Sequence, residues 1–210
     1  MRTGISVALI IVALARPAAA QGILDKFSYE GLAFSGVGVA FGAVTSNRLT
    51  DEIIGAVRVD YGFIAPRVRV LLGGSYFKGD FDAEEISEFE TKLRGLVRDP
   101  TRDFTINVGT VSWSDLALDF DLQYLLQASS RVRTFAGVGV ASHLRNGSGR
   151  AIEGTFVEDA LDNIEAGLNF SLATEVTLVR HLDFTVELRG GITSGLRTGS
   201  ILSGLMYRVH

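Results

Sequence analysis

The sequence between residues 115 and 124 reads DLALDFDLQY, in which every second residue is large and apolar and the residues between them are polar or, at Ala117, small. Successive side chains of a β-strand point to opposite faces, so this stretch predicts a strand with one apolar and one polar face. The same alternation recurs at residues 29–44, 53–63, 67–76, 131–140, 164–176, 182–189 and 201–209. The chain therefore predicts an all-β fold of eight strands.

The stretch at residues 29–44 is the least regular of these strands. Its second half alternates, but Phe34 breaks the pattern. One extra residue in a strand shifts the side chains that follow it to the opposite face, which is the effect of a β-bulge. We therefore expect a bulge near Ser35.

The alternation does not say which face of the sheet points inward. A soluble, lipocalin-like barrel places its apolar face inside, whereas a membrane barrel turns that face to lipid. The connections after the second, fourth and sixth strands are tight, whereas those at residues 79–112 and 144–163 are long. One short rim and one elaborated rim are typical of outer-membrane barrels. We therefore predict an eight-stranded antiparallel up-and-down transmembrane β-barrel.

The five tyrosines fall on the apolar faces of their strands, near the strand ends. Aromatic rings that are apolar at one end and polar at the other collect at membrane interfaces. We expect an interfacial aromatic girdle made of Tyr29, Tyr61, Tyr124 and Tyr207 near the short turns, and Tyr76 at the opposite rim.

The polar faces carry small residues together with charges of both signs. The interior of an eight-stranded barrel is only just wide enough for side chains, and buried charges need partners. A static ionic plug is therefore favoured over a gated pore. The expected lumenal charge network consists of Arg58, Asp60, Arg69, Asp119, Asp121, Arg133, Glu175, Glu187, Arg189 and Arg208.

The N-terminus has the three parts of a secretory signal peptide: Arg2, an apolar run from Ile5 to Ala15, and the small residues Ala18 to Ala20. The apolar run is shorter than the about 20 residues that a membrane-spanning helix needs. We expect export to the outer membrane. The domain organisation is then a signal peptide at residues 1–20 cleaved near Ala20, a short periplasmic lead at 21–28, and the barrel at 29–210.

The composition limits the possible partners. The 210-residue chain has a net charge of −4 and no cysteine. A nucleic-acid-binding protein needs a basic face, so no nucleic-acid partner is expected. A small exported protein without disulfides needs another source of stability, and a closed barrel provides one through its complete hydrogen-bond ladder.

The last strand contains Gly204, Tyr207 and Val209, a glycine followed three and five positions later by apolar or aromatic residues. This spacing resembles the C-terminal signal by which outer-membrane barrels are recognised for assembly. Leu202 and the terminal His210 depart from that pattern, in which a polar residue and a phenylalanine are usual.

With its strands and signal peptide, the chain resembles the small eight-stranded outer-membrane barrel family that includes the OmpA transmembrane domain, OmpX and OmpW. The resemblance covers about residues 29–210 and is architectural. It implies residence in outer-membrane lipid with lipopolysaccharide, contact with the barrel assembly machinery, and a monomer. It identifies no activity.

The first long connection contains apolar residues at helical spacing between residues 83 and 97. This spacing predicts a short amphipathic helix. This connection either forms a recognition surface or a lid over the barrel mouth, or it simply packs on its own rim. Nearby acids either bridge to lipopolysaccharide through divalent cations or form a solvated face; they are Asp80, Asp82, Glu84 and Glu85.

No residue pattern predicts an enzyme. The three histidines have no metal-binding spacing, and Ser142-His143 is the sequence nearest to a lipid A hydrolase site. Adjacent residues of a strand point to opposite faces, so this pair cannot act together without a bulge. We therefore expect no catalytic residue, no cofactor and no metal.

The sequence thus favours a non-enzymatic outer-membrane protein with a structural or surface-interaction role in its external loops. One alternative is a narrow transporter for small hydrophobic solutes, like the OmpW group, because Leu71, Phe77 and Phe135 are expected to point inward. A second alternative is a lipid A-modifying enzyme.

Overall fold

The computed structural model describes residues 28–96, 109–150, 152–154 and 161–209. The expected signal peptide, and residues 21–27 of the expected lead, lie outside these described residues. Within the described part of the chain, no helix is long and apolar enough to cross a membrane.

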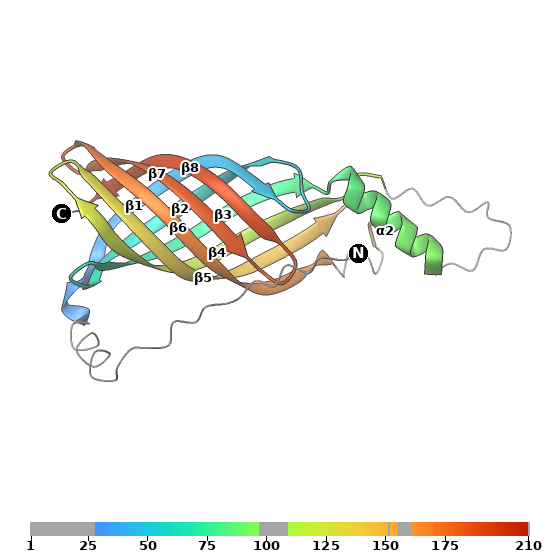
Figure 1. The fold of residues 1–210 in the computed structure, drawn as a ribbon, viewed down its shortest axis with the longest axis horizontal. Coiled ribbons are helices and arrows are strands. Elements are labelled where there is room, and N and C mark those ends of the chain that lie inside the picture. The colour runs from blue at the N-terminus through green and yellow to red at the C-terminus, as the bar shows by residue number, and fades with distance from the viewer. Residues whose placement is uncertain (1–27, 97–108, 151, 155–160, 210) are drawn as a thin grey trace, which may run out of the picture.

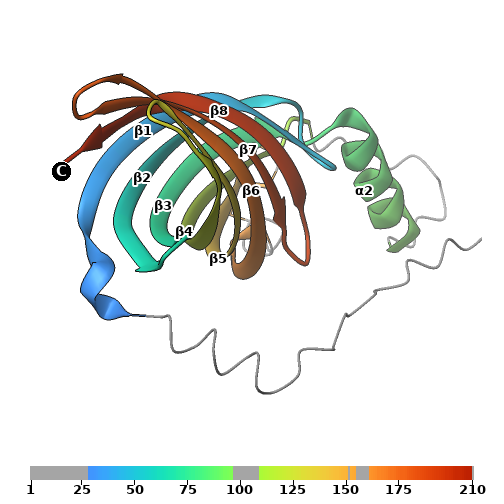
Figure 2. The ribbon, with the colours of Figure 1, turned by 60° about the vertical axis from the view of Figure 1, so that its left-hand side comes forward.

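Eight strands of the described chain form one closed antiparallel barrel (Figures 1 and 2). Each strand pairs with the next along the chain, and the last returns to pair with the first. The eight-stranded up-and-down barrel predicted from the sequence is therefore confirmed. The strands are β1 (Leu32–Ser46), β2 (Glu52–Ala65), β3 (Val68–Asp80), β4 (Ser112–Ala128), β5 (Val132–Ser148), β6 (Asn163–Val179), β7 (Leu182–Ile192) and β8 (Arg197–Arg208).

The two ends of the barrel differ. Short turns join β2 to β3, β4 to β5 and β6 to β7 at the end where the chain also finishes, which we call the turn end (Figure 1). A short 3-10 helix, η1 (Tyr29–Gly31), precedes β1 there. The opposite, loop end carries α2 (Ala83–Leu96) between β3 and β4. The helix expected at residues 83–97 is thus confirmed as far as residue 96.

The barrel closes where β8 meets β1, and the backbones approach closely at this seam. A Cβ atom at Gly42 of β1 would overlap the backbone of Ile201, and one at Gly204 of β8 would overlap the backbone of Val39. A larger residue at either position would push the two strands apart. Glycine is therefore a requirement of closure at these two positions.

The start of β1 contains the irregularity that the sequence indicated. The pairing with β2 shifts register between Leu32 and Gly36, which confirms the bulge expected near Ser35. The facing part of β2 contains Gly62 at a φ of 79°, a left-handed conformation that favours glycine. Its N–H donates to the Asp60 carboxylate at 2.7 Å.

The outward faces of the strands are apolar and the inward faces are buried. In the middle of β4, Leu118 is 56% exposed, whereas its neighbours Ala117 and Asp119 are each 6% exposed. Every strand exposes large apolar side chains in this way. An apolar outer surface of this extent needs an apolar environment, and a charged interior is the reverse of a soluble carrier. The lipocalin-like alternative is therefore wrong.

This orientation predicts a depth-dependent cost for a charge on the outer face. Phe120, which is 43% exposed, lies midway along β4 between Tyr124 and the residue paired with Tyr76. We expect Phe120→Arg to lower the free energy of unfolding in lipid vesicles by about 2–4 kcal/mol. Leu126→Arg, close to the turn end, should cost about 0–1 kcal/mol. Equal losses in a urea titration would contradict the proposed depth of β4.

Candidate functional site

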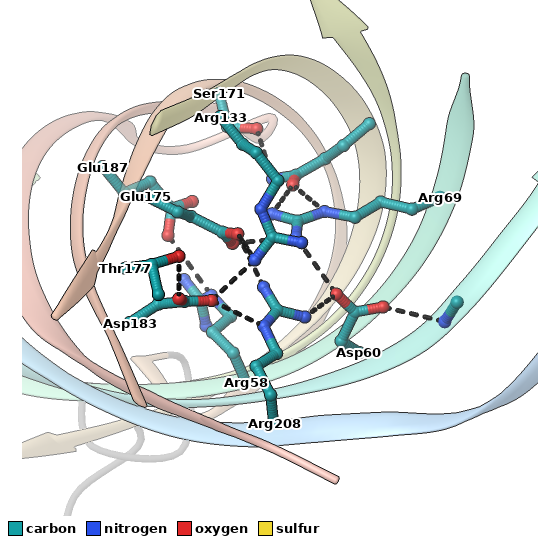
Figure 3. Close-up of polar contacts among 12 residues, drawn as sticks. Arg58, Asp60, Arg69, Arg133, Ser171, Glu175, Thr177, Asp183, Glu187 and Arg208 are labelled. Atoms are coloured by element: carbon teal, nitrogen blue, oxygen red, sulfur yellow. Dashed lines mark hydrogen bonds and ion pairs between the residues drawn. The ribbon is translucent and has the colours of Figure 1, made fainter. Parts of the chain in front are cut away.

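The inward-facing charges near the turn end form one connected group, which we call the turn-end network (Figure 3). Three arginines face three carboxylates in it, so its formal charges balance. Its members come from β2, β3, β5, β6, β7 and β8, and are Asp60, Arg69, Arg133, Glu175, Asp183 and Arg208.

Arg208 connects three walls of the barrel at the centre of this network. Its Nε donates to Asp183 at 2.8 Å, its Nη2 to Glu175 at 2.6 Å, and its Nη1 to Asp60. Arg133 reaches two of the same acids, with Nη2 2.6 Å from Asp183 and 3.1 Å from Glu175. Charge-assisted bonds of this length are among the strong ones in proteins. The network therefore connects β8 across the lumen to β2, β5, β6 and β7.

Arg69 closes the other side of the turn-end network. Its Nη1 lies 3.0 Å from the Asp60 carboxylate and 2.8 Å from that of Glu175. Its Nε donates to the side-chain oxygen of Gln123 at 2.9 Å, and its guanidinium lies 3.6 Å from the ring centroid of Phe135. Each of these buried groups thus has a partner of suitable chemistry.

A second group, the middle network, lies farther toward the loop end and contains Arg58, Asp119, Asp121, Glu187 and Arg189. Arg189 pairs closely with Asp121 at 2.7 Å, Asp119 at 2.9 Å and Glu187 at 3.0 Å. Arg58 is held more loosely, 3.5 Å from Asp119 and 3.4 Å from Glu187. Its buried Nη2 has no hydrogen-bond partner in the described structure.

Inward glycines make room for these acids on the neighbouring strands. A Cβ atom at Gly73 would overlap the Asp119 carboxylate, and one at Gly139 would overlap that of Asp121. The glycine-rich inner faces and the carboxylates are therefore complementary. Together, the two networks contain all ten lumenal residues that the sequence singled out.

A third group near the loop end, the loop-end network, was missed by sequence reasoning. Asp115 accepts from His143 Nδ1 at 2.9 Å and from Arg145 Nε at 2.9 Å, and Arg145 Nη1 donates to Glu165 at 2.6 Å. Arg145 also donates to the Thr193 hydroxyl at 3.0 Å. The alternation places Asp115 on the polar face of its strand, but the strand expected at residues 131–140 ends before Arg145. Longer strands would have placed Arg145 directly opposite Asp115.

An apolar cluster, of which sequence reasoning singled out Phe77 alone as inward-facing, fills the lumen beside the loop-end network. Its buried members are Ala40, Val44, Leu49, Ile54, Ala56, Phe77, Trp113, Leu196 and Leu202. The indole Nε1 of Trp113 donates to the Leu161 carbonyl at 2.9 Å, and its ring stacks on Phe81 at 5.4 Å between centroids. The Arg145 guanidinium lies 4.9 Å from the same ring. Trp113 therefore joins the cluster, the loop-end network and the outer loops.

Described residues line two small cavities inside the barrel, each of about 30 Å³. One lies beside Arg58 and Glu175, and the other beside Asp119 and His143. A cavity of this size has room for one or two water molecules. His143 lines the second cavity, and its buried Nε2 has no hydrogen-bond partner in the described structure.

Four tyrosines project from the outer faces of strands, and Tyr29 is exposed in η1 before β1. Tyr29, Tyr61, Tyr124 and Tyr207 lie toward the turn end with exposed side chains, and Tyr76 lies toward the loop end. The three residues of the expected assembly signal divide between the faces. Gly204 faces inward against Ala40, whereas Tyr207 and Val209 face outward and are exposed. The role of these residues in assembly stays a prediction.

Ser142 and His143, the pair nearest to a hydrolase site, lie on opposite sides of the barrel wall. Ser142 is exposed on the outer face, whereas His143 is buried in the lumen.

No group of three or more histidines, cysteines or carboxylates within the described ranges is arranged to hold a metal ion. Two of the acids near the first long connection have partners within the protein. Asp80 accepts from the Ser112 hydroxyl, and Glu85 lies 4.0 Å from Arg48.

Comparison with known proteins identifies the architecture. No protein-family model and no curated protein matches the sequence. Neisserial surface protein A (NspA) is structurally similar, with a TM-score of 0.56 and 9% identity over 83% of this chain and 96% of that one. Ail of Yersinia pestis has a TM-score of 0.49 and 9% identity, over 84% of this chain and 99% of Ail. The N-terminal barrel domain of Pseudomonas aeruginosa OprF has a TM-score of 0.43 and 12% identity, over 83% of this chain and 98% of that domain. The fold is that of the eight-stranded outer-membrane β-barrels.

The geometry of the turn-end network predicts a large cost for removing its central cation. Arg208→Met leaves the acids around it short of partners, and breaking a buried ion pair costs about 3–5 kcal/mol. The matched control, Arg197→Met at the exposed start of β8, should change stability by no more than about 0.5 kcal/mol. Adding Asp183→Asn to Arg208→Met should recover part of the loss, because the two sites are coupled.

Urea-induced unfolding in lipid vesicles measures all three variants. If Arg208→Met costs no more than Arg197→Met, the ion pairs of the turn-end network do not hold the barrel together.

Proposed function

We propose that this protein is a closed, integral outer-membrane barrel that catalyses no reaction and acts through its loop-end surface. The observation that carries the proposal is the contrast between a filled lumen and a supported set of outer loops. A filled lumen leaves little room for solute movement or for a substrate. The described parts of these loops offer a supported surface outside the membrane.

The ion-pair networks support the closed state. Arg208 joins three carboxylates of β2, β6 and β7 in one layer, and Arg189 joins three carboxylates in the next. An ion crossing the barrel would have to separate partners that lie about 3 Å apart in a region of low dielectric constant. Eight strands also give a lumen that side chains alone can fill.

The inward aromatic residues give little support to the transporter alternative. Phe135 is completely buried and is covered by the Arg69 guanidinium, and Phe77 belongs to the packed apolar cluster. These rings contact neighbours rather than lining an open path. The lipid A hydrolase alternative loses its candidate pair, because Ser142 and His143 lie on opposite faces.

The outer loops rest on a second apolar cluster above the rim. Val111 and Ile152 are buried in it, with Phe81, Ile86 of α2 and Leu161 packed against them. This cluster attaches the helix to the connection between β5 and β6.

Backbone hydrogen bonds fix the start of α2 from below. The N–H of Asp82 donates to the Arg48 carbonyl at 3.0 Å, and the N–H of Phe81 donates to the Val111 carbonyl at 2.9 Å. The exposed acids Asp51, Glu84 and Asp162 lie on this supported surface. A supported surface of this kind fits recognition better than a mobile loop does.

Conductance in planar bilayers tests the closed state. The native protein should produce no stepwise current. Stepwise current from the native barrel would contradict the closed lumen and revive the transporter alternative.

Replacing residues 83–108 with a short glycine–serine linker tests the loop-end surface. The variant should keep the mobility shift between boiled and unboiled samples, because all strands remain. Cells that carry it should lose surface attachment or become sensitive to detergent. A matched replacement of two exposed α2 acids, Glu84 and Glu88 by glutamine, separates the charge of the helix from its presence. Unchanged attachment and unchanged detergent resistance in the linker variant would contradict a role for this surface.

A further inference from the structure

Each of the three short turns at the turn end carries one arginine. Arg67 lies in the turn between β2 and β3, Arg131 in the turn between β4 and β5, and Arg180 in the turn between β6 and β7. All three side chains are exposed. We call this set the arginine ring.

The backbone of each turn is held by the strand beside it. The carbonyl of Arg67 accepts from the N–H of Leu125 at 2.7 Å, and that of Arg131 accepts from the N–H of Thr177 at 2.8 Å. In the third turn, the carbonyl of His181 accepts from the N–H of Arg208 at 2.8 Å. The three guanidiniums therefore extend from fixed points around the rim.

The arginine ring has no internal counter-charge. None of the ion pairs between described residues includes Arg67, Arg131 or Arg180. The acids nearest the turn end in the lumen, Glu175 and Asp183, are buried and already paired. The loop end differs in its balance of charge. The turn end exposes Glu30 of η1, whereas exposed acids are frequent at the loop end: Asp51, Glu84, Glu153 and Asp162.

We propose that the arginine ring binds the phosphate groups of anionic phospholipids in the leaflet around the turn end, an inference that rests on the proposed membrane residence. Guanidinium binds phosphate through paired N–H donors, and anionic leaflets attract basic residues near their surface. The turns are too short to carry these side chains far from the membrane. Arg67 Nη1 lies 3.5 Å from the hydroxyl of Tyr124, a ring that projects from the outer face.

The placement of the ring favours lipid over a single macromolecule. The three turns join different pairs of neighbouring strands, so the three arginines lie at different points of the circumference. Lipids surround a barrel and meet each side separately. A macromolecular partner would have to cover the whole turn end to contact all three.

Spin-labelled lipids test the proposal on the full-length barrel in bilayers. Electron paramagnetic resonance measures how strongly the protein immobilises phosphatidylglycerol relative to phosphatidylcholine. The native barrel should prefer phosphatidylglycerol several-fold at low salt and less so at high salt. The triple substitution Arg67→Gln, Arg131→Gln and Arg180→Gln should bring the ratio close to one.

The matched control removes three exposed cations from the loop end, namely Lys78, Arg150 and Arg197, each changed to glutamine. It should keep the lipid preference, because the loop end carries an excess of acids. A native barrel without preference, or a preference that survives the turn-end triple, would overturn the proposal. The proposal would also be overturned if the turn-end triple lost binding to purified cell-wall sacculi but kept its lipid preference. That result would assign the arginine ring to the cell-wall polymer.

The mobility shift on boiling separates this proposal from the proposed function. A native protein that neither inserts into vesicles nor shows the shift contradicts membrane residence itself. A protein that inserts and shifts but lacks the lipid preference contradicts only the arginine ring.

Discussion

Pairing of buried charge is the constraint on which the rest of this structure depends. The barrel encloses arginines and carboxylates that would each cost several kcal/mol if left without partners in a low-dielectric interior. Arg208 and Arg189 meet this demand by contacting three carboxylates each. Such contacts require strands at fixed register and inner faces with room, which Gly73 and Gly139 provide beside Asp119 and Asp121.

The charged interior and the apolar exterior follow from one another. A strand that buries Asp119 must expose Leu118 and Phe120, and a barrel of such strands is stable only where its outside meets lipid. With the lumen filled and the wall in lipid, chemistry directed at other molecules is confined to the two ends. The ends differ in charge and in structure: a supported acidic surface at one, and short turns with unpaired arginines at the other.

Much of this fold was readable from the sequence, because lipid and lumen impose a strict alternation on each strand. That alternation located the strands and separated their two faces, the unequal connections indicated which face meets lipid, and the break at Phe34 located the bulge. It fades toward the loop end, where exposed outward positions such as Asn146 of β5 are polar. The extension of β5 to Ser148, and with it the Asp115–His143–Arg145 contacts, was therefore missed. The partner of each lumenal charge depends on register and barrel stagger, which sequence periodicity does not encode.

The most direct test of the account is a spin-label scan of residues 115–124, one cysteine at a time, in a chain that has no cysteine of its own. Collision rates with oxygen, which dissolves in lipid, should alternate with a period of two residues and peak at Leu116, Leu118, Phe120 and Leu122. Peaks at the intervening positions, or rates without alternation, would contradict a barrel that turns its apolar face to lipid and its charges to a closed lumen.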